Sequence, residues 1–224
     1  MNSSSNQKEI FLSGEGDSWF DRNKFLDIDD RINNDLILNE ISRLEIKPKR
    51  ILEVGCAEGW RLNELSKRYS CECVGFDPSS KAILIGRDLY PNVRLEVGTA
   101  DIISEEDESV DLLIIGFCLY LCDRNDLFSI AREVDRVLEN KGLIIILDFY
   151  SEIPYKNKYT HKDGIYAFKM DYASMFKWNP FYSVVSTVIS SHGMEKIVGN
   201  KDERICISSL RKSIDDAYTV KPDY

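Results

Sequence analysis

The sequence predicts a doubly wound α/β fold, in which helices cover both faces of a mostly parallel sheet. Short apolar runs alternate with helical hydrophobic patterns from about residue 29 to residue 149. One run, Asp111–Ile115, is almost continuously apolar, as expected for a strand buried on both faces. Two later runs rich in β-forming residues, Phe181–Ser190 and Arg204–Leu210, predict an antiparallel pair at the C-terminus and bring the expected strand count to seven.

The elements follow from the period of the hydrophobic residues and from capping and breaking residues. The expected elements, in order, are a helix from about Asp29 to Leu44 capped by Asp29 or Asp30, a strand at Ile51–Val54, a helix carrying Leu62, Leu65 and Tyr69, a strand at Cys73–Phe76, a helix capped by Ser79 or Ser80 that stops before Pro91, a strand near Val93–Val97, the strand Asp111–Ile115, a helix from about Arg124 to Leu138 and a strand at Leu143–Phe149.

The regular alternation stops after the fifth strand. Residues 150–180 are aromatic and polar, with only Lys169–Phe176 suited to a short helix, and long irregular insertions in compact domains are usually functional. Residues 1 to about 10 are polar and rich in Ser and Asn, which predicts disorder. We therefore divide the chain into an N-terminal arm (1–28), one domain (29–212) with an insertion on its substrate side (150–180), and a tail (213–224).

Composition limits the classes of function. The 224 residues include 43% hydrophobic residues, enough for one domain with a substantial core. The net charge of −9 disfavours nucleic-acid partners, which require clustered Lys and Arg. Because the N-terminus is polar and no apolar run is long enough to span a membrane, we expect a cytoplasmic protein without membrane contact. The six cysteines meet no zinc spacing, so we expect reduced thiols and no metal.

The stretch Ile51-Leu52-Glu53-Val54-Gly55-Cys56-Ala57-Glu58-Gly59-Trp60 predicts a strand, a tight turn and a helix N-terminus. Small residues at Gly55, Ala57 and Gly59 let a ligand approach the backbone, as a nucleotide cradle requires. Two glycines alone would indicate only a turn. However, Asp77 follows Glu53 by twenty-four positions at the end of the next predicted strand, and ligands bind at the carboxyl ends of strands in open α/β sheets.

Together with Val74-Gly75-Phe76-Asp77-Pro78-Ser79, this stretch resembles the class I S-adenosylmethionine-dependent methyltransferases, a Rossmann-like superfamily. The resemblance covers about residues 30 to 211, with Ala57 in place of the middle glycine of the family's G-x-G-x-G loop. It implies S-adenosylmethionine as the cofactor. The implied cofactor-binding residues are Glu53, Gly55, Cys56 and Ala57 at the first loop, Asp77 and Pro78 at the ribose, Ala100 and Asp101 near the adenine, and Phe117 against the methionine moiety.

Some members of that family fold an N-terminal segment over the cofactor. By this resemblance Trp19 or Phe20 caps the pocket, and Arg22 meets the carboxylate of the cofactor. The alternative is that both aromatic residues only attach the arm to the core.

Methyl transfer from a sulfonium mainly requires the donor and acceptor to be held in line, so few catalytic residues are needed. A hydroxyl acceptor also needs a base, and the chain has two histidines. His161, in the insertion, is the candidate base, and Tyr120 is a candidate for orienting the acceptor. The alternatives are a solvated loop histidine and a packing tyrosine, and His192 is expected to be a surface turn residue.

The acidic chain also lacks the Asn-Pro-Pro-aromatic signature of nucleic-acid amino-methyltransferases after the fourth strand. We therefore expect a small polar acceptor, preferably a hydroxyl of a sugar or sugar nucleotide, with a small amine as the alternative. A nicotinamide-dependent oxidoreductase would require G-x-G-x-x-G, which this loop does not supply. A cofactor-binding protein without catalytic activity stays open.

Overall fold

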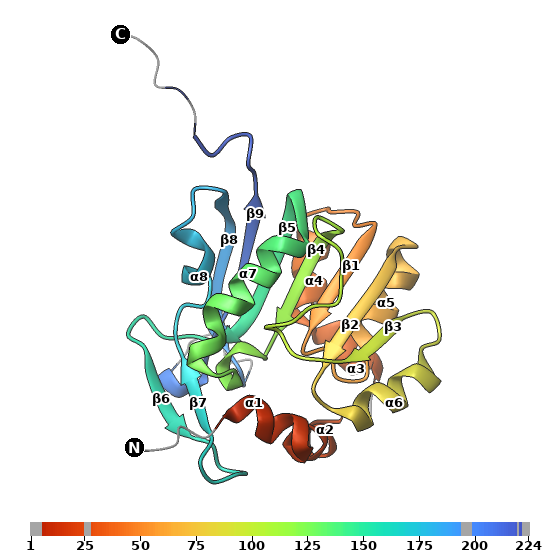
Figure 1. The fold of residues 1–224 in the computed structure, drawn as a ribbon, viewed down its shortest axis with the longest axis vertical. Coiled ribbons are helices and arrows are strands. Elements are labelled where there is room, and N and C mark those ends of the chain that lie inside the picture. The colour runs from red at the N-terminus through yellow and green to blue at the C-terminus, as the bar shows by residue number, and fades with distance from the viewer. Residues whose placement is uncertain (1–5, 25–27, 194–198, 219, 221–224) are drawn as a thin grey trace.

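The computed structural model describes residues 6–24, 28–193, 199–218 and 220, and a seven-stranded sheet forms its centre (Figure 1). The strand order is β3-β2-β1-β4-β5-β9-β8. The strands are β1 (Arg50–Val54), β2 (Glu72–Asp77), β3 (Arg94–Val97), β4 (Val110–Gly116), β5 (Leu138–Phe149), β8 (Tyr182–Ser191) and β9 (Arg204–Lys212). The first five are parallel, whereas β9 and β8 are antiparallel, which confirms the predicted fold class.

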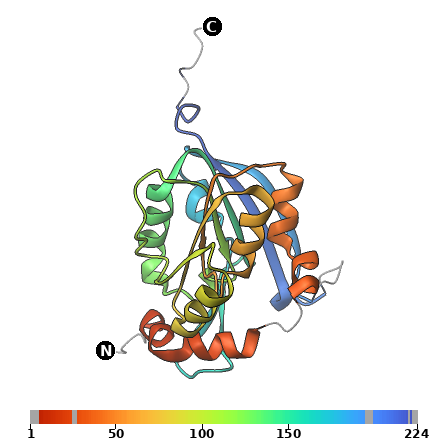
Figure 2. The same ribbon diagram turned by 90° about the vertical axis from the view of Figure 1, so that its right-hand side faces the viewer.

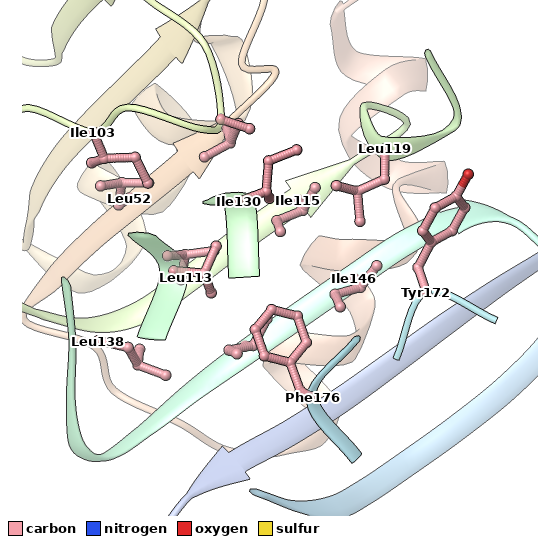
Figure 3. Packing of buried hydrophobic residues seen from close by; sticks show 14 of the residues in the cluster. Leu52, Ile103, Leu113, Ile115, Leu119, Ile130, Leu138, Ile146, Tyr172 and Phe176 are labelled. Carbon is pink, nitrogen blue, oxygen red and sulfur yellow. The ribbon is translucent and has the colours of Figure 1, made fainter. Parts of the chain in front are cut away.

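Helices form a layer on each side of the sheet (Figure 2). One layer contains α4 (Leu36–Arg43), α5 (Trp60–Tyr69) and α6 (Ser80–Leu89), and the other contains α7 (Leu127–Val137) and α8 (Ser174–Lys177). Because a buried parallel strand presents apolar side chains to both layers, the core is divided into two clusters. In Figure 3, Leu113 and Ile115 of β4 lie in the cluster that also contains Ile130 of α7.

The order of the strands positions the candidate site. From β1 the chain moves outward through β2 and β3, and it then returns to place β4 and β5 on the other side of β1. The loops after β1 and β4 therefore diverge at the carboxyl edge of the sheet. A crevice at such a reversal point is where ligands bind in open α/β folds.

The N-terminal arm consists of α1 (Gln7–Ile10), a π-helical turn (Phe11–Glu15) and α2 (Gly16–Asn23), and it crosses the carboxyl ends of the parallel strands (Figure 1). The predicted disorder is therefore wrong for residues 7–10, while residues 1–5 lie outside the described residues. The Gln7 side chain is buried and donates to the carbonyl of Leu121 at 2.8 Å, while its oxygen accepts from the Tyr166 N–H at 2.8 Å. Polar contacts to distant segments order this helix, and a local hydrophobic pattern does not reveal them.

Several element boundaries differ from the prediction. The helix expected from Asp29 to Leu44 is divided into α3 (Ile28–Asn34) and α4, because the Asp35 side chain accepts from the Leu38 N–H at 2.8 Å and begins a new helix. The predicted helix Lys169–Phe176 is wrong in its first half, since Lys169 ends β7 (Tyr166–Lys169), which pairs with β6 (Tyr155–Lys158), and α8 begins only at Ser174. Before α7, residues Arg124–Asp126 form a 3₁₀ turn.

The centre of the sheet allows a test of the packing. Leu113 is fully buried in β4, whereas Leu84 on α6 is 63% exposed. We expect Leu113→Ala to lower the free energy of unfolding by about 2–5 kcal/mol, because a buried cavity is left behind. Leu84→Ala should change it by less than about 0.5 kcal/mol. Urea unfolding of both variants measures the difference, and equal effects would contradict the assigned core.

Candidate functional site

A pocket with about 780 Å³ of free space, part of it open to solvent, lies in this crevice. Its walls come from the loops after β1, β2, β3 and β4 and from the arm, so residues far apart in the sequence meet here. Among the residues that line it are Lys8, Phe11, Gly16, Trp19, Gly55, Asp77, Pro78, Thr99, Ala100, Asp101, Phe117, Cys118, Leu121, Cys122, Asp123, Asp126 and Ile130.

The loop after β1 is shaped by close approach of the backbone. Gly55 has φ +75°, and an added Cβ would lie 2.9 Å from the Cβ of Cys118, so only glycine fits between this loop and the loop after β4. The N–H groups of Gly55 and Cys56 donate to the Phe76 carbonyl at 2.8 and 3.2 Å. Ala57 has φ +48°, a strained conformation for a residue with a side chain. The loop is thus hydrogen-bonded to β2, and its Gly55 lines the pocket.

The Asp77 carboxylate joins this loop to α6. One oxygen accepts from the Ala57 N–H and the other from the Ser79 N–H, both at 2.8 Å. Because a carboxylate has about four acceptor positions, each oxygen keeps capacity for a further donor from the pocket. Burial raises the pKa of Asp77 to about 6, although the two backbone N–H groups act in the opposite direction.

Asp101 lies across the pocket and is paired with the arm. Its carboxylate accepts from Lys8 Nζ at 2.6 Å, and the same ammonium lies 3.1 Å from Asp126. Burial opposes ionisation of Asp101, but the hydrogen bond from Lys8 is among the contacts that outweigh burial, so the pKa of Asp101 is lowered. Lys8 was missed in the sequence because it follows a Ser-rich and Asn-rich stretch with no pattern around it.

Glu53 and its partner lie beneath the loop, outside the pocket lining. The Glu53 side chain is fully buried and bonds to Arg61 of α5, which also pairs with Asp35 at 2.9 Å. Burial raises the pKa of Glu53 to about 7. Its Oε2 atom has no hydrogen-bond partner in the described part of the chain. The structure therefore places this predicted cofactor residue behind the site, with one oxygen unused.

The aromatic residues of the arm take different positions. Trp19 lines the pocket, and its Nε1 donates to the Tyr120 hydroxyl at 3.3 Å. Phe20 is buried against Ala57 and Ala82. Arg22 is outside the pocket lining and donates to Glu15 at 2.5 Å and to the Tyr159 hydroxyl at 2.9 Å.

A side chain of α2 fastens the arm. Asp17 accepts from the Ser79 hydroxyl at 2.7 Å and from the Lys81 N–H at 3.0 Å, both at the start of α6. An added Cβ at Gly16 would lie 3.2 Å from the Ser79 nitrogen, so the two segments are in close contact. The arm therefore closes the pocket through polar bonds to the residues that follow Asp77.

The predicted catalytic residues are not together. Tyr120 is buried next to Trp19, and burial raises the pKa of its hydroxyl. His161 is exposed between β6 and β7, where its ring centroid lies 5.3 Å from that of Tyr159, and it does not line the pocket. His192 lies in a turn as expected, but its ring packs against Phe117 and Phe149.

Asp148, at the end of β5, is a buried carboxylate that sequence analysis did not identify. It accepts from the Tyr120 N–H at 3.2 Å and from the Phe149 N–H at 2.7 Å, which holds the segment after β4 against β5. Burial raises its pKa to about 7, although the hydrogen bonds from these N–H groups act in the opposite direction.

The described residues also include no helix that is both long enough and apolar enough to cross a membrane.

Comparison with known proteins gives matches in sequence and in fold. Residues 51–142 match the methyltransferase domain family. The uncharacterized methyltransferase YcgJ of Bacillus subtilis is 29% identical over 108 residues, which are 46% of this chain and 41% of that protein. Ajmaline N-methyltransferase of Rauvolfia serpentina is 30% identical over 110 residues, 46% of this chain and 37% of that protein. The chain thus spans less than half the length of both curated relatives.

A solved structure extends the similarity of the fold. It is the 1,6-didemethyltoxoflavin-N1-methyltransferase of Burkholderia thailandensis, with 1,6-didemethyltoxoflavin and S-adenosylhomocysteine bound. Its TM-score is 0.67 at 12% identity, and the alignment covers 92% of this chain and 87% of that one. At this identity the match shows that the fold is shared.

Asp148 predicts a dependence of stability on pH. Its carboxyl titrates near 7 in the folded protein and near the usual 3.8 in the unfolded chain, so between these values only the folded state holds the proton. Its contribution to the free energy of unfolding therefore falls as pH rises through this window. In Asp148→Asn that fall is absent. The free energy of unfolding of the variant, relative to that of wild type, should therefore rise by on the order of 1 kcal/mol per pH unit.

Urea unfolding of wild type and Asp148→Asn at both ends of the window measures this change. Comparing the two proteins isolates Asp148 from the other buried carboxylates. A difference between them that stays constant with pH would contradict the assigned titration.

Proposed function

We propose that the protein is a class I S-adenosylmethionine-dependent methyltransferase, as the match of residues 51–142 to the methyltransferase domain family supports, and that it binds S-adenosylmethionine in the pocket and transfers its methyl group to a small molecule. The observation that carries the proposal is the Asp77 carboxylate. It is fixed by two backbone N–H groups and lines the pocket. A vicinal pair of ribose hydroxyls supplies the two donors that these oxygens can still accept.

The other walls fit the remaining parts of this cofactor. Gly55, Phe117 and Trp19 line the pocket, and we propose that the methionine moiety binds beside them. Pro78, Ala100 and Asp101 also line it, and we propose that Pro78 contacts the ribose and that Ala100 and Asp101 contact the adenine. Cys56 and Ala57 contribute through the shape of the loop.

Two predicted cofactor contacts require a change. Arg22 is held by Glu15 and Tyr159, so reaching the cofactor carboxylate requires one of these bonds to open. One Glu53 oxygen has no hydrogen-bond partner in the described part of the chain. We propose that Glu53 supports the loop after β1, and that it contacts the cofactor directly only if a donor group of the cofactor reaches this oxygen.

The bound cofactor would supply an activated methyl group, so the protein has to hold and enclose the reactants. Asp77 and the Gly55 loop hold the donor. The arm, fastened by Lys8 and Asp17, covers the pocket in part, and we propose that it opens for ligand exchange. We propose that Tyr120, which accepts from Trp19, orients the acceptor, and His161 stays a prediction as the base.

For the acceptor we propose a small polar metabolite, preferably with a hydroxyl of a sugar or sugar nucleotide. The support is the net charge of −9, which disfavours nucleic acids. A small amine is the alternative, favoured by the names of two similar proteins, an ajmaline and a didemethyltoxoflavin N-methyltransferase.

Cofactor binding can be tested through Asp77. We expect Asp77→Asn to weaken binding of S-adenosylhomocysteine by about 10- to 100-fold, because hydrogen bonds to a charged carboxylate are replaced by weaker ones. The matched control is Asp88→Asn, an exposed carboxylate on α6, which should bind as wild type does. Calorimetric titration measures affinity, and urea unfolding shows whether each variant is folded. Unchanged affinity in a folded Asp77→Asn would contradict the proposed site.

Methyl transfer can be tested with methyl-labelled S-adenosylmethionine. We expect label in small acceptors from a panel of sugars, sugar nucleotides, phenols and amines, and none in RNA or DNA. The products are separated by chromatography. Tight cofactor binding with no labelled product from any class would support a protein that binds the cofactor without catalysis, and label in nucleic acid would contradict the proposed acceptor class.

A further inference from the structure

We propose that His192, whose ring lies beside the Glu203 carboxylate, is the base that accepts the proton of the acceptor's O–H or N–H group. The inference rests on the proposed methyl transfer and adds to it the residue that removes the proton. It stands on the position of His192 between the pocket wall and a carboxylate.

The first observation is the pairing of His192 with Glu203. The His192 N–H donates to the Glu203 carbonyl at 2.8 Å, which fixes the turn after β8 against the start of β9. The Nδ1 atom lies 3.9 Å from Glu203 Oε2. A carboxylate beside Nδ1 favours the tautomer with the proton on that nitrogen, so Nε2 is left as the basic atom. At 3.9 Å the two side chains are not hydrogen-bonded, and they form an ion pair only when His192 is protonated.

The second observation is the contact of His192 with the pocket wall. Phe117 lines the pocket and has φ +49°, a strained conformation of the kind found at functional sites. The His192 ring centroid lies 5.4 Å from that of Phe117, and it stacks on Phe149 at 5.3 Å with an interplanar angle of 28°. Phe149 also contacts Tyr120, whose hydroxyl accepts from Trp19.

These rings form a continuous group from the pocket to the His192 turn. We call Trp19, Phe117, Tyr120, Phe149 and His192 the aromatic group. The His192 ring is itself outside the pocket lining, so the proposal requires an acceptor that extends from the pocket past Phe117 to the imidazole. The His192 side chain is 53% exposed, so a proton taken from the acceptor can pass on to water.

His161 lacks this combination. It lies on the β6–β7 hairpin beside Tyr159, and in the described residues no carboxylate lies within ion-pair distance of it. The charged groups near the aromatic group include Glu203, Asp148, which accepts from the Tyr120 and Phe149 N–H groups, and Lys169, whose Nζ lies 4.6 Å from the Phe149 ring centroid and 3.7 Å from Asp202.

The step balances as a displacement with proton transfer. The acceptor oxygen or nitrogen forms a bond to the methyl carbon while the bond from that carbon to sulfur breaks, and the electron pair of that bond stays on sulfur. The acceptor proton moves to His192 Nε2, and the resulting imidazolium lies beside Glu203. Water then removes the proton, and the base is restored.

The two histidines allow a test that needs no acceptor. Their ring signals are followed by NMR during pH titrations with S-adenosylhomocysteine or S-adenosylmethionine bound, and His161→Asn assigns them. The two ligands differ by one methyl and one positive charge on sulfur. If His192 lies near that sulfur, its titration midpoint should be lower with S-adenosylmethionine by roughly 0.3 pH unit or more, because a nearby cation disfavours a second one.

The midpoint of His161 should be the same in both complexes. Equal midpoints for His192, or a shift at His161 in its place, would overturn the proposal.

A kinetic test follows with any acceptor that accepts label. We expect His192→Asn to lower kcat by about 100-fold or more and to remove the rise of kcat with pH, while S-adenosylhomocysteine affinity stays as in wild type. Glu203→Gln should give a smaller loss, and Glu152→Gln, an exposed carboxylate in the insertion, none. Normal kcat in His192→Asn would refute this inference alone, whereas loss of all cofactor binding in wild type would refute the proposed function.

Discussion

The site depends on one carboxylate that holds two segments together. Asp77 accepts from the Ala57 N–H in the loop after β1 and from the Ser79 N–H at the start of α6. Without these bonds two buried donors would lack partners, at a cost of about 1–3 kcal/mol each. The same carboxylate faces the pocket, and burial raises its pKa to about 6. Asp77 therefore both stabilises the local structure and faces the proposed ligand site.

The arm extends this arrangement over the pocket. Asp17 bonds to Ser79 and to Lys81, so the arm is attached to the turn that Asp77 organises. At the other end Lys8 pairs with Asp101 and Asp126. All these bonds are polar and partly exposed, so each contributes modestly and the arm can open without disturbing the apolar core. A cover of this kind suits a pocket that must exchange its ligand.

The sequence was sufficient for the sheet and for part of the site. Apolar period and capping residues predicted the seven strands and the position of Asp77, because these features depend on neighbours in the chain. The order of residues 7–10 was missed because it depends on contacts such as the one from Gln7 to Leu121, 114 positions away. The position of Glu53 beneath the loop was missed for the same reason, since Arg61 and Asp35 come together only in the fold.

The most direct test of the account is a crystal structure of the protein with S-adenosylhomocysteine bound. The account predicts that both ribose hydroxyls donate to the Asp77 carboxylate, that the adenine lies near Asp101, and that the homocysteine moiety passes Gly55 toward Phe117. A ligand bound elsewhere, or one whose ribose makes no contact with Asp77, would contradict it.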